Sequence, residues 1–261
     1  MPLLNYRNIN INYTSRGIGR AIVLLHGFLE NINMWSEVAK ELSKKNRVIC
    51  VDLLGHGKTD NLGYIHTMEE QAKMVKFVLD HLKLRKYILI GHSMGGYTSL
   101  AFAENYPENL KGICLMNSSA LPDSKERKAN RDRAIEAVKY KSEIFVKMVI
   151  PNLFSEDNVD KFKEEIDQVT MEALQISNRG IIAALEGLKT RSDYTDLYGT
   201  LKIPVQMIIG RKDPALDYTS LIDETKDTKV FVVEFPDGHM SHFENKQELI
   251  HALKLFIKLC G

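Results

Sequence analysis

The sequence has few cysteines. Its 261 residues contain three, Cys50, Cys114 and Cys260, which lie far apart and form no C-x-x-C pair. This spacing excludes a disulfide scaffold and gives no support for a thiolate zinc site. Cys50 and Cys114 lie within apolar runs, so we expect both to be buried as small hydrophobic residues. A reducing compartment, and hence a cytoplasmic location, is the matching expectation.

An excess of one charge and a long apolar run are also absent. Thirty-five Lys and Arg residues are balanced by 34 Asp and Glu residues, for a formal net charge of +1. Such a chain has no long-range field with which to attract nucleic acid or an anionic membrane surface. No apolar run approaches the roughly 18 residues of a membrane span, and the first residues do not resemble a secretory signal. We therefore expect neither a nucleic-acid partner nor a membrane span.

The sequence does contain an alternation of apolar strands and helical patterns. Continuous apolar runs are typical of strands that are buried on both faces of a parallel sheet. Ile9, Ile11 and Tyr13 alternate with polar residues and predict an antiparallel strand near the start. The pattern as a whole predicts an α/β fold with a mostly parallel central sheet flanked by helices. The predicted buried strands are 21–25, 48–51, 87–90, 113–116, 205–209 and 230–235.

Helices are predicted between these strands. Residues 67–70 and 245–248 have the pattern of a capping box, and 94–105 is a helical stretch that Pro107 stops. From Asn117 to about Thr200 there is no strand pattern, only charge-rich amphipathic stretches at 134–141, 143–150, 159–166 and 181–188. We interpret 120–196 as a helical lid (cap) inserted into a core domain formed by 1–119 and 197–261. An ordinary helical subdomain with no gating role is the alternative.

A Gly-x-Ser-x-Gly motif follows the strand at 87–90. Gly91 and Ser93 lie between this strand and the helix at 94–105, and Gly95 is the second residue of that helix. This is the context that gives the motif meaning. The sharp turn would leave no room for side chains at the two glycines and would raise the Ser93 hydroxyl above the strand end. The helix that follows points its free N–H groups at the same place. Ser93 is therefore the candidate nucleophile.

A nucleophilic serine needs a base and an acid that orients it. His239 lies in the loop after the last predicted strand, and Asp213 lies in the loop after the strand before it. The chain order Ser93, Asp213, His239 is the order of α/β-hydrolases. His242 remains an alternative base and Asp217 an alternative acid. For the other histidines we expect structural roles in tight turns (His26, His56, His92) or surface positions (His66, His81, His251).

Negative charge that develops on a substrate oxygen needs donors. The strand at 21–25 ends in His26-Gly27-Phe28, where Gly27 allows a close backbone approach. The backbone N–H groups of Phe28 and Met94 are the natural pair for an oxyanion hole. Their side chains would then form part of the pocket wall, or simply pack in the core.

These motifs together resemble the α/β-hydrolase fold family of esterases, lactonases and related enzymes, over residues 1–117 and 200–261. In that family the aspartate and Gly-His-Gly turn that match Asp52 are structural, and the tryptophan that matches Trp35 packs under the oxyanion loop. Some members carry their acid where this chain has Asn117, which cannot act as a carboxylate. Ser93 excludes the relatives with an aspartate nucleophile. The matching motifs are His26-Gly27-Phe28, Asp52-Leu53-Leu54-Gly55-His56-Gly57, Gly91-His92-Ser93-Met94-Gly95-Gly96, Gly210-Arg211-Lys212-Asp213 and Gly238-His239.

The resemblance implies a serine hydrolase that cleaves a small or medium carboxylic ester through an acyl-serine, with no metal or organic cofactor. The partner would be a small-molecule ester, and the oligomeric state is left open. A lyase or C–C bond hydrolase on the same triad is an alternative, because menaquinone-pathway enzymes of this fold share the His-Gly-Phe loop. A small-molecule receptor that retains the triad is another, since fold alone does not select a function.

Apolar residues of the insertion are the candidate substrate contacts. Phe145, Met148 and Phe154 recur at helical spacing, and we expect Ile144, Phe145, Met148 and Val149 to share one face. If the insertion caps the sheet, part of that face would roof the pocket above Ser93. Such a pocket would favour apolar acyl groups over charged ones, because a buried unpaired charge is costly.

Overall fold

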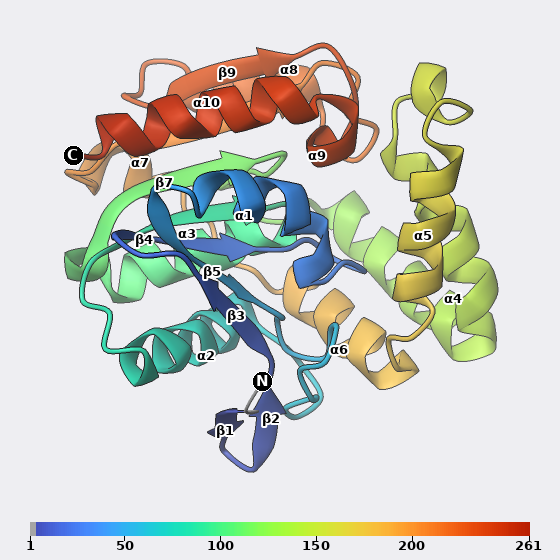
Figure 1. Ribbon diagram of the computed structural model, residues 1–261. Coiled ribbons are helices and arrows are strands. Elements are labelled where there is room, and N and C mark those ends of the chain that lie inside the picture. The colour runs from blue at the N-terminus through green and yellow to red at the C-terminus, as the bar shows by residue number, and fades with distance from the viewer. Residues whose placement is uncertain (1–3) are drawn as a thin grey trace.

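The computed structural model describes residues 4–261, which form a twisted seven-stranded sheet. Helices cover both of its faces (Figure 1). The strand order is β3-β5-β4-β6-β7-β8-β9, and every neighbouring pair is parallel except the antiparallel pair β3-β5. Each predicted apolar run becomes one of these strands. Their bounds are β3 (Tyr13–Arg16), β4 (Arg20–Leu25), β5 (Asn46–Val51), β6 (Tyr87–His92), β7 (Leu110–Met116), β8 (Val205–Gly210) and β9 (Phe231–Phe235).

The N-terminal alternation forms two strands in different sheets rather than one. Ile9 and Ile11 belong to β2 (Ile9–Ile11), which pairs antiparallel with β1 (Leu4–Tyr6), whereas Tyr13 begins β3. The chain leaves the small sheet at Asn12, whose amide donates to Thr59 Oγ1 and whose side chain donates to Asp52. These bonds replace the ladder bonds of a continuous strand, which the alternation alone could not reveal.

Helices cover both faces of the large sheet. One face is covered by α1 (Ser36–Leu42) and α10 (Lys246–Leu259). The apolar cluster between these helices and the sheet includes the buried Trp35. On the other face lie α2 (Met68–His81), α3 (Met94–Asn105) and α8 (Tyr218–Thr225). Thr67 caps α2 as predicted, by accepting from the Glu70 amide. Asn245 precedes α10 but makes no side-chain cap hydrogen bond, and its side-chain amide donates to Asp237.

The segment between β7 and β8 contains helices, turns and loops but no strand, and its long helices stand at the carboxyl ends of the strands (Figure 1). Its long helices are α4 (Lys125–Val149), α5 (Lys163–Ala173) and α6 (Asn178–Lys189). The stretches predicted at 134–141 and 143–150 join into α4, which is kinked at Lys141. The segment has its own apolar cluster, which includes Phe145 and Phe154. The shorter helices are α7 (Leu197–Thr200), α9 (Ser241–Glu244) and 3-10 turns at Ile32–Trp35, Pro107–Asn109, Pro151–Leu153 and Glu156–Asn158.

The helix α6 packs closely on the loop that precedes α2. The His66 amide donates to the Ala183 carbonyl, and a Cβ on Gly187 would lie 1.8 Å from the His66 carbonyl oxygen. The expectation that His66 lies at the surface is therefore wrong: its side chain is buried under α6. Burial lowers the pKa of His66 to about 4. Its position next to an inserted helix could not be seen from the local sequence.

Candidate active site

Ser93 lies in the tight turn between β6 and α3, at φ 49° and ψ −113°. The two glycines of the motif are sterically required there. A Cβ on Gly91 would lie 2.2 Å from the Gly95 carbonyl oxygen, and a Cβ on Gly95 would lie 2.3 Å from the Leu25 carbonyl oxygen. The Ser93 amide is tied to the end of β7 by a 2.9 Å bond to the Met116 carbonyl. The positive φ is therefore stabilised by packing on both sides, as expected for a strained residue at a functional site.

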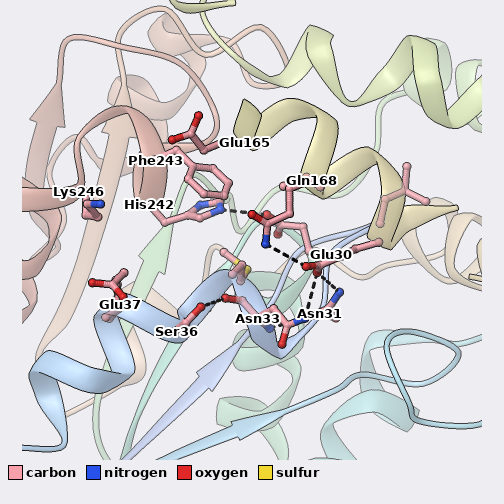
Figure 2. A pocket seen from close by; sticks show the side chains of 15 residues that line it. Glu30, Asn31, Asn33, Ser36, Glu37, Glu165, Gln168, His242, Phe243 and Lys246 are labelled. Carbon is pink, nitrogen blue, oxygen red and sulfur yellow. Dashed lines mark hydrogen bonds and ion pairs between the residues drawn. The ribbon is translucent and has the colours of Figure 1, made fainter. Parts of the chain in front are cut away.

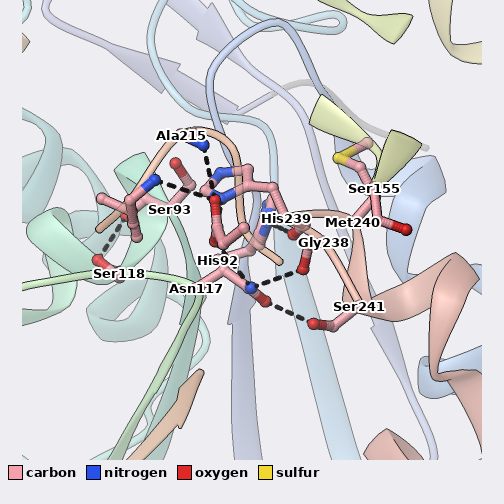
Figure 3. Close-up of polar contacts among 12 residues, drawn as sticks. His92, Ser93, Asn117, Ser118, Ser155, Ala215, Gly238, His239, Met240 and Ser241 are labelled. Carbon is pink, nitrogen blue, oxygen red and sulfur yellow. Dashed lines mark hydrogen bonds and ion pairs between the residues drawn. The ribbon is translucent and has the colours of Figure 1, made fainter. Parts of the chain in front are cut away.

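Asp213 and His239 are brought together from the loops after β8 and β9. Figure 3 shows His239 beside Ser93 and Asn117. His239 Nδ1 lies 2.7 Å from Asp213 Oδ2, and the Asp213 side chain is fully buried. The other carboxylate oxygen accepts from the amides of Ala215 and Leu216, at 2.8 and 3.0 Å. Burial by itself raises the pKa of Asp213, but the charge of His239 and these hydrogen bonds outweigh it and lower the pKa.

Asn117, at the end of β7, supports this pair. Its side-chain amide donates to Asp213 Oδ2 and to the Gly238 carbonyl, at 3.1 Å each, and its oxygen accepts from the Ser241 hydroxyl at 2.7 Å. The sequence indicated only that Asn117 cannot be the acid. Its place at the same strand edge as Ser93 was the signal that could have marked it as a support for the acid.

Ser93 and His239 line one cavity of about 400 Å³, between the sheet and the inserted helices. Phe28 also lines it, as does Phe145 of α4. Met148 does not, and the expectation for it is wrong: 56% of its surface is exposed. Adjacent helical residues are rotated by 100°, so Ile144 and Met148 form an outer stripe that is separate from Phe145 and Val149.

Phe154 also differs from its predicted role. It is buried inside the insertion, where it stacks on Phe243, and the cavity is lined by its neighbour Leu153 instead. The Leu153 carbonyl accepts a 3.0 Å hydrogen bond from the His239 amide. The insertion is thus bonded directly to the loop that carries His239.

The cavity is not wholly apolar, contrary to the sequence expectation. Arg127, Asn130 and Arg131 of α4 line it together with the aromatic and aliphatic side chains. The sequence showed α4 only as charge-rich, and such residues are usually solvated. The fold instead turns one polar face of this helix toward the site.

The two alternative residues occupy other environments. His242 lines a different pocket, of about 200 Å³, beside Glu30, Gln168 and Phe243 (Figure 2). Burial lowers the pKa of His242 to about 3, so its ring is neutral at pH 7. Asp217 caps α8 by accepting from the Ser220 amide at 2.7 Å. Neither residue lines the cavity that contains Ser93.

A buried ion pair lies beneath the site. His92 Nδ1 is 2.7 Å from Glu30 Oε2, which also accepts from the Gly27 amide, and His92 Nε2 is 3.0 Å from the His239 carbonyl. Both ring nitrogens face acceptors, so both carry hydrogen and the ring is positively charged. Burial opposes charge on both groups, but their mutual attraction prevails: it lowers the pKa of Glu30 to about 2 and raises the pKa of His92. The sequence missed Glu30 and gave His92 only a turn role.

The proposed oxyanion donors stand at the two loops next to Ser93. Phe28 follows β4 and lines the cavity, and Met94 is the first residue of α3. The first N–H groups of a helix have no carbonyl partner within it, so the Met94 amide is free of the helical ladder. Gly27 is tightly enclosed, because a Cβ there would lie 2.5 Å from Glu30 Oε2 and 2.7 Å from His92 Nδ1. Glu30 and His92 thus fix the loop that carries Phe28.

Within residues 4–261 no group of three or more His, Cys, Asp or Glu side chains is arranged to hold a metal ion. In the same part of the chain, no helix is both long enough and apolar enough to cross a membrane. Asp52, by contrast, has a structural environment, because its carboxylate accepts from Asn12, the Ile32 amide and the Lys58 amide.

Comparison with known proteins identifies the family. The sequence model of the alpha/beta hydrolase fold matches residues 20–246. The chain belongs to the alpha/beta hydrolase fold family. Solved structures of this fold that are similar to the chain include a thermophilic esterase from Thermogutta terrifontis with malate bound (TM-score 0.90, 29% identity, 99% of this chain and 97% of the other). An enol-lactonase from Burkholderia xenovorans has a TM-score of 0.90 at 22% identity, over 98% of this chain and all of the other.

A curated relative gives the same picture at the level of sequence. The 3-oxoadipate enol-lactonase 2 of Acinetobacter baylyi is 24% identical to this alpha/beta hydrolase over 99% of each chain. The family and these neighbours support a hydrolase-type enzyme. The family and these neighbours do not identify the bond that the enzyme cleaves.

Proposed function

We propose that this protein is a serine hydrolase that cleaves a carboxylic ester with a small or medium acyl group, through an acyl-Ser93 intermediate. One observation carries the proposal: Ser93 and His239 line the same cavity, and His239 is bonded at 2.7 Å to the buried carboxylate of Asp213. Esterase and enol-lactonase neighbours support the same reaction class.

In the first half-reaction, Ser93 Oγ attacks the ester carbonyl while His239 Nε2 accepts the hydroxyl proton. Asp213 keeps the other ring proton on Nδ1, so that Nε2 is unprotonated and able to act as a base. The backbone N–H groups of Phe28 and Met94 donate to the oxyanion of the tetrahedral intermediate. Collapse of the intermediate breaks the bond to the alcohol oxygen, which takes the proton from His239. The acyl group stays on Ser93.

In the second half-reaction, His239 takes a proton from water as the water attacks the acyl-Ser93 carbonyl. The Ser93–acyl bond breaks, Ser93 Oγ regains the proton from His239, and the carboxylic acid leaves. Neither step requires a metal or an organic cofactor. We also propose that the helical insertion acts as a lid, which the lining of the cavity by its residues Phe145, Val149 and Leu185 supports.

Labelling with a fluorophosphonate probe tests the nucleophile. We expect the probe to modify Ser93 and labelling to disappear in Ser93→Ala, whereas the exposed Ser36→Ala variant should react like the wild type. Labelling that survives Ser93→Ala would overturn the assignment.

Turnover of p-nitrophenyl esters of graded chain length tests the reaction. We expect multiple turnovers with short and medium acyl groups. A single slow acylation without turnover would instead indicate a receptor that retains the triad, and labelling without acylation by any ester would indicate different bond chemistry.

A further inference from the structure

One wall of the Ser93 cavity is built from successive turns of α4. Arg127, Asn130, Arg131 and Ala134 line the cavity, and their spacing of three, one and three residues places them on a single helix face. Among the described residues, no Asp or Glu side chain lines this cavity. The remainder is largely apolar, with Phe28, Phe145, Leu153, Leu185 and Leu188 among its members. The cavity therefore has a cationic wall and an apolar wall.

The positive charge on this wall is only partly neutralised. Asp123 is the shared partner of two arginines: its Oδ1 lies 2.5 Å from Arg191 Nη1, and its Oδ2 lies 3.1 Å from Arg131 Nε. The Asp123–Arg191 pair is buried. Arg131 lies nearer the surface, with 24% of its side chain exposed. One carboxylate thus serves two guanidinium groups.

Arg127 has no carboxylate partner within residues 4–261. Its Nη2 donates to the Ala215 carbonyl at 2.5 Å, in the loop that carries Asp213. Arg127, Arg131, Arg191 and Asp123 together carry a net charge of +2. Two of the three cations line the cavity in which Ser93 lies.

We propose that the α4 wall binds a free carboxylate on the substrate, so that the enzyme prefers esters that carry a second, ionised carboxyl group. This inference rests on the proposed function and narrows its substrate class. A guanidinium group presents a planar fork of N–H donors that matches the two oxygens of a carboxylate. In a partly enclosed cavity the attraction between a guanidinium group and an anion is screened less than in bulk water, and an alkyl chain offers no such attraction.

Mono-p-nitrophenyl adipate tests the preference when the carboxylate is on the acyl side. Its neutral comparators are the methyl p-nitrophenyl diester of adipic acid and p-nitrophenyl heptanoate. A second pair, 4-carboxyphenyl acetate and its methyl ester, tests a carboxylate on the alcohol side. With enzyme-free rates subtracted, we expect kcat/KM for the carboxylate substrate to exceed that of its methyl ester by about tenfold or more in at least one pair. No preference in either pair overturns the inference.

Variants of Arg131 locate the effect. Arg131→Gln should lower kcat/KM for the preferred carboxylate substrate by about tenfold to a hundredfold, mainly through KM, and change the neutral comparator less than threefold. Arg131→Lys should restore part of the loss, because it keeps the charge without the fork. The matched control is Arg133→Gln on the exposed side of the same helix, outside the cavity lining. Equal losses for charged and neutral esters would show a merely structural role and overturn the inference.

A binding experiment separates this inference from the proposed function. Monomethyl adipate is titrated calorimetrically into Ser93→Ala and into Ser93→Ala/Arg131→Gln. If the wild type hydrolyses no ester while Arg131→Gln still weakens the binding of monomethyl adipate, that result would overturn ester hydrolysis and support the anion site. Hydrolysis of neutral esters, with no dependence on Arg131 in either experiment, would overturn the anion site and leave the proposed function standing.

Discussion

At the scale of single residues, two aspartates four positions apart differ entirely in their surroundings. Asp213 is buried, accepts from two backbone amides and contacts His239, whereas Asp217 accepts from the Ser220 amide at the start of α8. Burial and the carboxylate's partners thus distinguish them, although both follow the same strand. Spacing along the sequence could only favour Asp213.

We predict that Asp213→Asn lowers kcat by about 10³-fold to 10⁴-fold, because the amide stabilises the wrong ring tautomer of His239. Asp217→Ala should leave kcat within about twofold and cost roughly 1 kcal/mol of stability through the lost helix cap. Steady-state kinetics and urea unfolding measure the two effects. A large loss of kcat in Asp217→Ala alone would reassign the acid.

The Glu30–His92 pair is the second prediction at this scale. Removal of one partner of a buried ion pair leaves the other charge without compensation. We expect Glu30→Gln to lower the free energy of unfolding by about 3 kcal/mol, measured by urea denaturation. The control is Glu37→Gln, an exposed residue beside the same pocket, which should change it by less than about 0.5 kcal/mol. Similar effects of the two substitutions would contradict the buried ion pair.

At the scale of elements, α6 of the insertion packs closely on the core. Gly180 and Gly187 both allow this approach, since a Cβ on either would lie within 2.5 Å of a backbone carbonyl oxygen of the core. The His66 amide adds a hydrogen bond to Ala183. These contacts dock α6 on the loop that precedes α2.

We predict that Gly187→Ala destabilises the protein by about 2 kcal/mol or more, because the added methyl group forces α6 away from the His66 carbonyl. Gly199→Ala is the matched control, since no atom lies within 4 Å of a Cβ there and the change should be neutral or slightly stabilising. Thermal unfolding of the two variants measures the difference. Equal melting temperatures would contradict close docking of α6.

The elements also show what sequence can and cannot predict. Runs such as 87–90 are apolar on both faces, so their strand assignment needed no tertiary information. The turn around Ser93 was likewise specified by glycines that no other residue could replace. The inward face of α4 was not predictable, because Arg127 and Met148 acquire their surroundings only when the helix docks. For the same reason the sequence could only propose Ser93, Asp213 and His239 as site residues, and it missed Glu30.

At the scale of the whole molecule, several histidines are buried in neutral form. Burial lowers the pKa values of His56 and His242 to about 3, and that of His66 to about 4. Because these values lie below the ordinary 6.5, the unfolded chain binds protons that the folded chain excludes. The stabilisation is complete above pH 6.5 and is lost as pH falls toward the folded pKa values. The lowered pKa of Glu30 adds a further loss of stability below about pH 4.5. The raised pKa of His92 has the opposite effect: its stabilisation is complete below pH 6.5 and is lost as the pH rises.

We therefore predict that the free energy of unfolding falls between pH 6.5 and pH 5, by up to about 2 kcal/mol for each such histidine. His242→Gln should flatten this slope, whereas the exposed His251→Gln should leave it unchanged. Urea unfolding at a series of pH values measures the slope. Parallel curves for wild type and His242→Gln would contradict a neutral, buried His242.

The position of the helical insertion between β7 and β8 also has a consequence for biosynthesis. These two strands pair directly, so β7 remains an open sheet edge until the whole insertion has left the ribosome. The nascent chain then already contains Ser93, but Asp213 and His239 have yet to be synthesised. We conclude that a chain arrested before β8 presents Ser93 without its proposed base and an unpaired strand that can aggregate. Under the proposed function, the triad is complete only after β8 and β9 have been added to the sheet.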